Sequence, residues 1–140
     1  MVTADQSDPT RIQAMMSLNK GMVIQELGWD EDVDDDLRNV VMDIIDDDLV
    51  EEAFEAVDAV LLWWRADDGD VTDGLVDALT DLSPSGAVWL LTPKVGRPGA
   101  ISSSDIAEAA ETAGLSLASP VDVSHQWQAQ RAARPKSARR

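Results

Sequence analysis

The sequence of 140 residues has no cysteine and no tyrosine, and it has one histidine and one phenylalanine. Without cysteine the chain can form no disulfide, no thiolate metal site and no cysteine nucleophile. No apolar run approaches the length of a membrane-spanning helix, about 18 residues. Residues 1–9 are polar and acidic rather than a signal peptide. We therefore expect a cytoplasmic protein that makes no contact with a membrane.

Basic residues are scarce and unevenly placed. The chain has 11 Lys and Arg against 27 Asp and Glu, which gives a formal net charge of −16. Residues 30–81 hold 20 of the acids and two of the bases, whereas the last ten residues hold five of the bases. An acidic body repels the phosphates of nucleic acid, so we expect none to bind to the folded domain. A basic protein partner fits such a surface better.

The titratable residues form no complete motif for catalysis or metal binding. The acidic runs at 30–36 and 46–48 do not match a calcium loop, and solvated helix flanks explain them more simply. His125 follows Ser124 directly, and adjacent residues on a strand face opposite ways, so they cannot form a catalytic pair. We expect no metal site and no catalytic residue, and we do not expect an enzyme.

The apolar segment at residues 58–65 organises the chain. Five consecutive apolar residues follow Ala59, as expected for a strand that is covered on both faces. Residues 87–92 have the same character, and the residues at 71–81 between them have the periodicity of an amphipathic helix. This order of strand, helix and strand predicts a right-handed βαβ unit and a parallel sheet.

The remaining patterns extend this unit to a whole domain. We expect helices at about 10–18, 34–46 and 103–113, a first strand at 22–27, a short second strand near 49, a turn at 83–86, and an antiparallel pair from 115–124 and 127–133. The fold class is α/β: one three-layer Rossmann-like domain with a mainly parallel sheet of five or six strands and an antiparallel C-terminal strand pair. We place a disordered N-terminus at 1–9, the domain at 10–133 and a basic flexible tail at 134–140.

Several segments carry a family resemblance. The segments Val23–Gly28, Asp58–Trp64, Leu82–Leu90 and Ala113–Leu115 follow the order seen in class I S-adenosylmethionine-dependent methyltransferases. More closely, residues 15–130 resemble a small actinobacterial family of acidic proteins without an assigned function, through Gly21–Asp30, Leu61–Arg65 and Trp89–Lys94. The resemblance implies a shortened Rossmann-like, methyltransferase-like sheet.

The turn after the first strand departs from the methyltransferase pattern. That family uses several small residues there, so that the backbone can approach the cofactor. This chain has Gly28 alone, followed by bulky Trp29 and by Asp30, Glu31 and Asp32. We therefore expect no cofactor.

Ligands of open α/β sheets bind beyond the carboxyl ends of the strands. In this chain the candidate ligand-binding residues at that rim are Gly28, Trp29, Trp64, Arg65, Thr92 and Lys94. Arg65 and Lys94 can bind an anion, together with the helix start at Ser103. Alternatively, they neutralise neighbouring Asp residues, which the sequence favours. Trp63 and Trp64 are expected to point to opposite faces of the sheet, under different helices.

Two classes of function follow from these observations. The first is a non-catalytic interaction or regulatory module on a degenerate methyltransferase-like scaffold, with its acidic surface facing a basic protein partner. The second is a protein or enzyme that binds a nucleotide-like or other anionic small molecule at the strand ends. The crowded, acidic turn after Gly28 favours the first class. The sequence leaves the oligomeric state open.

Overall fold

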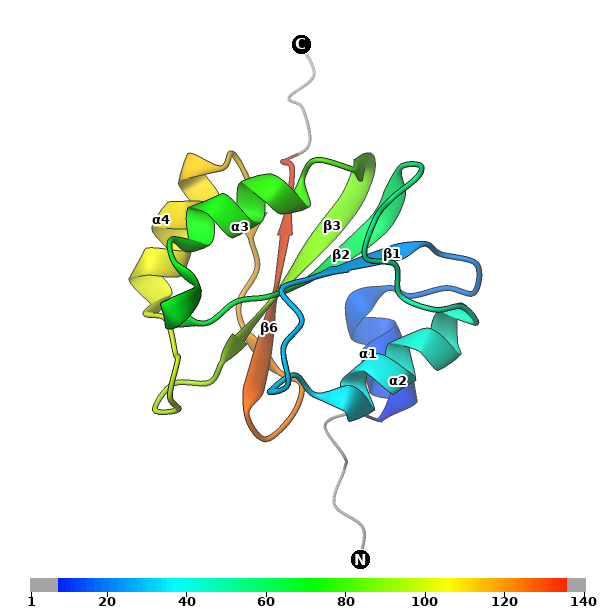
Figure 1. Cartoon of the computed structure of the whole chain (residues 1–140), viewed down its shortest axis with the longest axis horizontal. Coiled ribbons are helices and arrows are strands. Elements are labelled where there is room, and N and C mark those ends of the chain that lie inside the picture. The colour runs from blue at the N-terminus through cyan, green and yellow to red at the C-terminus, as the bar shows by residue number, and fades with distance from the viewer. Residues whose placement is uncertain (1–7, 136–140) are drawn as a thin grey trace, which may run out of the picture.

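A mixed six-stranded sheet lies between two pairs of helices in the computed structural model, which describes residues 8–135 (Figure 1). The strand order is β1-β2-β3-β6-β4, and β5 also pairs with β6. The strands are β1 (Ile24–Leu27), β2 (Val57–Trp63), β3 (Leu82–Pro93), β4 (Ser116–Leu117), β5 (Val121–Asp122) and β6 (Trp127–Ala133). The first three strands are parallel, and β6 runs antiparallel to β3, β4 and β5. The predicted α/β sheet with an antiparallel C-terminal pair is confirmed.

Strand β2 is the apolar segment on which the prediction rested, and it is covered on both faces. Leu61 and Trp63 point into one apolar cluster, and Val60 and Leu62 point into the other. The helices α1 (Pro9–Met16) and α2 (Asp35–Ile45) cover the first face. The helices α3 (Val71–Ala78) and α4 (Ser103–Thr112) cover the second face and lie on the left in Figure 1, opposite to α1 and α2.

Each helix begins where the sequence offers a side-chain acceptor. Asp34 accepts the backbone N–H of Leu37 at 2.8 Å, and Ser102 accepts that of Asp105 at 3.2 Å. Such caps satisfy N–H groups that have no partner within the helix. Acidic residues in the first turn of α2 also favour the positive end of the helix dipole. The caps therefore set the positions of α2 and α4 along the sheet.

Two local expectations need correction or refinement. Residues 83–86 were expected to form a turn, but they lie inside β3, because Leu82 already pairs with Val57 before the register shifts. The second strand expected near residue 49 is reduced to one bridge between Val50 and Gln25.

The ends of the domain also differ from the expected boundaries. Helix α1 begins at Pro9, capped by Asp8, although residues 1–9 were expected to be disordered. Within the expected tail, Arg134 donates hydrogen bonds to the carbonyls of Ser83 and Leu79. The rest of these two predictions concerns residues 1–7 and 136–140, which lie outside the described residues. Between residues 8 and 135, no helix is long and apolar enough to cross a membrane.

Candidate functional site

The carboxyl ends of β1, β2 and β3 lie at one edge of the sheet, because the three strands are parallel. Gly28 follows β1 there with a φ of +78°, a conformation that side chains rarely adopt. A Cβ atom added to Gly28 would lie 2.1 Å from the carbonyl oxygen of Trp63 at the end of β2. Gly28 is therefore required by the close approach of two backbones, and this approach leaves no space between them.

Arg65 covers the corner between Gly28 and the end of β2. Its Nη1 atom donates to the carbonyl of Gly28 at 2.7 Å and to the carboxylate of Asp68 at 3.2 Å. Its Nε atom donates to the carboxylate of Asp32 at 3.0 Å. The guanidinium also lies 5.3 Å from the ring centroid of Trp127, within the range of a cation–π contact. With 11% of its side chain exposed, Arg65 fills the rim between β1 and β2.

These contacts shift the ionisation of both partners. The hydrogen bond from Arg65 holds the pKa of Asp32 below its usual value, against the opposing effect of partial burial. Burial alone would lower the pKa of Arg65, but its hydrogen bonds to Asp32 and Asp68 outweigh this effect and raise it. Asp32 and Arg65 are therefore both charged at neutral pH, and carboxylates of the same chain already neutralise the positive charge of Arg65.

A second charged group lies below the corner, on the α2 side of the sheet. Glu26 has 4% of its side chain exposed and receives two hydrogen bonds from Arg38, at 2.7 and 2.8 Å. It also accepts the indole N–H of Trp63 at 2.9 Å. The hydrogen bonds to Glu26 raise the pKa of Arg38 above its usual value, although burial opposes them. This buried carboxylate thus accepts three hydrogen bonds, two of them from a positive charge.

Two tryptophan side chains connect these groups. The rings of Trp63 and Trp127 meet edge to face, with centroids 4.8 Å apart. The indole N–H of Trp127 donates to the backbone carbonyl of Asp32 at 3.1 Å. The contacts thus form one continuous series from Arg38 on α2 to Arg65 after β2. The series ties the loop after β1 to strand β6.

The other candidate residues are dispersed around the rim. Trp64 packs on α3, where Gly74 makes room for it: a Cβ atom there would lie 2.7 Å from the ring. Trp29 is 52% exposed, whereas Thr92 is buried and lies 3.3 Å from the amide of Gln128. Lys94 forms an ion pair with Asp122 at 3.4 Å. Arg65 and Lys94 therefore pair with separate carboxylates. Trp63 and Trp64 lie in opposite clusters, as expected.

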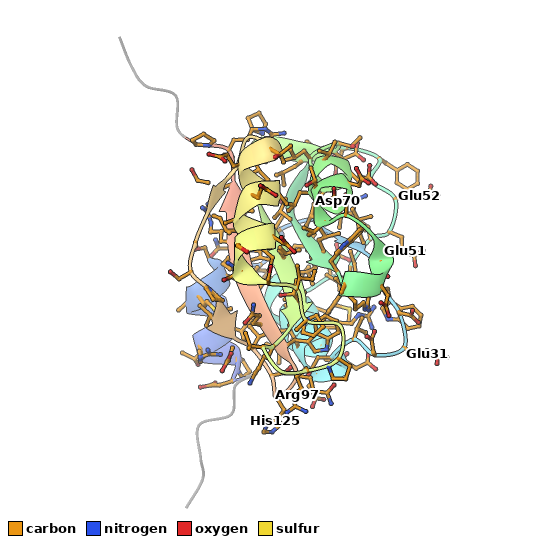
Figure 2. All side chains as sticks on the ribbon, turned by 90° about the vertical axis from the view of Figure 1, so that its left-hand side faces the viewer. Glu31, Glu51, Glu52, Asp70, Arg97 and His125 are labelled. Atoms are coloured by element: carbon orange, nitrogen blue, oxygen red, sulfur yellow. The ribbon has the colours of Figure 1, made fainter. Side chains whose placement is uncertain are left out.

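Two hollows lie near the strand ends. A small one of about 190 Å³ is bordered by Asp32, Val33, Asp34, His125, Gln126 and Trp127. Its histidine carbonyl accepts a hydrogen bond from Arg97 at 3.2 Å, and Figure 2 shows the two residues side by side. A larger groove of about 730 Å³ lies between α3 and α4. Among the described residues, no group of three His, Cys, Asp or Glu side chains could hold a metal ion.

Sequence reasoning missed two of these features. Glu26 was read as part of a strand, although a charged residue within an apolar strand and an arginine 12 positions later are a visible signal for a buried ion pair. The groove depends on how closely two helices approach, which no local pattern reports. Its one visible signal is the spacing of three between Asp105, Glu108 and Glu111.

Comparisons with known proteins identify relatives and a fold. A family model described as "Protein of unknown function (DUF3052)" matches residues 13–136. Uncharacterized proteins of Mycobacterium bovis and Mycobacterium tuberculosis are each 45% identical over 123 residues, which cover 87% of this chain and 77% of each relative.

Among solved structures, a SAM-dependent methyltransferase from Aquifex aeolicus matches with a TM-score of 0.57 and 16% identity, over 89% of this chain and 88% of that one. A magnesium protoporphyrin IX methyltransferase from Synechocystis, solved with bound SAM, matches with a TM-score of 0.59 and 10% identity, over 93% and 79% of the two chains. These likenesses show a methyltransferase-like Rossmann fold.

The residues at the corner do not fit the cofactor of those methyltransferases. S-adenosylmethionine would need open space beside the backbone after β1. Here the Gly28 backbone lies against the backbone of Trp63, and the Gly28 carbonyl already accepts a hydrogen bond from Arg65. The carboxylate of the cofactor would also meet the acidic run that begins at Asp30, where repulsion opposes its binding.

Proposed function

This chain belongs to the DUF3052 family of proteins of unknown function, and we propose that it is a non-catalytic interaction module whose acidic surface binds a basic protein partner. The fold is methyltransferase-like, but the corner that would hold a cofactor is filled by the chain itself. The observation that carries the proposal is the position of Arg65. Its guanidinium binds Gly28, Asp32 and Asp68 at once and covers the edge between β1 and β2.

The acidic surface supports this proposal. Most acids in residues 30–81 are exposed, and Glu31, Glu51 and Glu52 project outward from one side of the molecule (Figure 2). Phe54, the single phenylalanine, is 94% exposed within this acidic loop. A surface of one charge sign accelerates encounter with a partner of the opposite sign, and an exposed aromatic ring can anchor the complex.

The competing function is binding of an anionic small molecule at the strand ends. It would need Arg65 to leave Asp32 and Asp68, and Lys94 to leave Asp122. An anion that replaced a carboxylate in these pairs would gain only the difference between two similar interactions. The geometry therefore favours the interaction module.

Two titrations of the full chain separate the two functions. The first adds a synthetic peptide of alternating lysine and alanine, with a glutamine-for-lysine peptide as control. We expect binding at low salt that weakens steeply at about 0.5 M salt, where charges are screened beyond about 4 Å. The second adds S-adenosylmethionine or ATP, for which we expect no saturable binding. Saturable binding of either small molecule, lost in Arg65→Met, would overturn the proposal in favour of a ligand site. Absence of peptide binding at low salt would also count against it.

A further inference from the structure

The groove between α3 and α4 lies on the face of the molecule opposite to α1 and α2 (Figure 1). It has a volume of about 730 Å³. Its apolar part is formed by small and branched residues, among them Val71, Ile101 and Ala109. Hydroxyl groups stand around them, from Thr72, Ser102 and Thr112. The groove therefore offers both apolar contact and hydrogen bonding along the length of α4.

Every charged residue that borders this groove is acidic. The four are Asp70, Asp105, Glu108 and Glu111. In the part of the chain that the structure describes, the side chains of the last three have no hydrogen bond or ion pair. This differs from the strand ends, where Arg65 and Lys94 pair with carboxylates. A hydrogen bond from the Thr72 N–H lowers the pKa of Asp70, which keeps this carboxyl ionised at neutral pH.

Asp105 lies in the first turn of α4, where the helix dipole favours an acid, but Glu108 and Glu111 are placed against the stability of their own helix. Asp105, Glu108 and Glu111 follow one another at intervals of three, so their like charges are neighbours on one helix face. Glu111 also lies in the last turn, where the helix dipole disfavours a negative charge, and α4 has no basic residue in that turn. Helix stability therefore does not explain Glu108 and Glu111.

We propose that this groove is the docking site for the basic partner, which lays an extended segment rich in lysine and arginine along α4. The inference rests on the proposed function and adds the place of contact. Charge complementarity selects the occupant: cationic head groups meet the row of carboxylates, and their methylene stems lie on Val71, Ile101 and Ala109.

The length of the helix sets the length of the segment. With 10 residues, α4 is about 15 Å long, at about 1.5 Å per residue. An extended chain covers that distance with about five residues. Such a segment places two or three side chains toward α4, which is close to the number of carboxylates on that helix.

The test is a titration of the full chain with a fluorescent synthetic peptide of alternating lysine and alanine, at low salt. One variant, Glu108→Gln/Glu111→Gln, removes two charges from the groove. The matched control, Asp36→Asn/Asp43→Asn, removes two exposed charges from α2, on the other side of the sheet from the groove. Thermal unfolding of each variant checks that it is folded.

We expect the groove variant to bind the peptide about tenfold more weakly, since it loses two ion pairs with the peptide, each of modest strength. The control loses none of these pairs and should weaken binding less than about twofold. The peptide should also shift the backbone amide resonances of residues 70–72 and 100–112. Equal weakening in both variants, or shifts confined to other residues, would overturn the groove while leaving a basic partner for the acidic surface. Absence of peptide binding to the wild type would overturn both.

Discussion

Gly28→Ala offers a direct test of the closed corner, because the structure predicts both the size and the cause of its effect. The added Cβ atom would lie 2.1 Å from the Trp63 carbonyl oxygen and 3.1 Å from its carbon, so one of the two strands must move. The left-handed conformation costs about 1–2 kcal/mol for a residue with a side chain. Overpacking against a backbone adds about 1–3 kcal/mol. We therefore expect a loss of about 3 kcal/mol in the free energy of unfolding.

Gly114→Ala is the matched control. Gly114 has nearly the same φ, +79°, but a Cβ atom there would have no heavy atom within 4 Å. It should therefore show the conformational cost alone, about 1–2 kcal/mol. Urea unfolding of the two variants and the wild type measures the difference. If Gly28→Ala is no more destabilising than Gly114→Ala, the two backbones do not meet as described and the reasoning fails.

Three further predictions concern the charged groups around this corner. Arg65→Met should lower the free energy of unfolding by about 2 kcal/mol, because charged hydrogen bonds are lost while the exposed Asp32 and Asp68 can be hydrated again; a change below about 0.5 kcal/mol in urea unfolding would show that Arg65 holds nothing together. Glu26→Gln should lower the free energy of unfolding by about 2 kcal/mol, because it leaves the half-buried Arg38 without its main carboxylate. Asp35→Asn, at a carboxylate that is 72% exposed, should lower it by less than about 0.5 kcal/mol, and equal effects would contradict the burial of the Glu26 pair. The pKa of Asp32 is lowered from 3.8 in the folded state, so its contribution to the free energy of unfolding is fully present above pH 3.8 and is lost as the pH falls through the folded pKa. Between neutral pH and about pH 2, the free energy of unfolding should therefore fall less in Arg65→Met than in the wild type, and parallel curves would argue against the pair.

Much of the fold could be predicted from local sequence patterns. The parallel sheet was predicted from β2 and α3. A strand that is buried on both faces appears as a continuous apolar run, whereas a helix that is buried on one face has apolar residues at helical spacing. The turn expected at 83–86 was wrong, since Pro and Gly favour turns locally while pairing of Leu82 with Val57 keeps the chain extended. The reduction of the second strand to one bridge at Val50 is also a tertiary effect.

The site was predictable only in its location. Parallel strands bring their carboxyl ends to one edge, which placed Gly28, Arg65 and Lys94 at the rim. The partners were not predictable, because Asp32 lies 33 residues from Arg65 and the packing alone joins them. Trp127 reaches the same corner from β6, on the far side of β3. Long-range contacts of this kind leave no trace in a local pattern.

The corner after β1 is closed by the protein itself, and a calorimetric titration with S-adenosylmethionine tests this claim most directly. Wild-type protein and Arg65→Met would be titrated under the same conditions with up to about 1 mM cofactor. A dissociation constant of about 1 mM corresponds to a binding free energy of about −4 kcal/mol. We expect no saturable heat for the wild type. Saturable binding to the wild type with a micromolar dissociation constant would contradict this expectation.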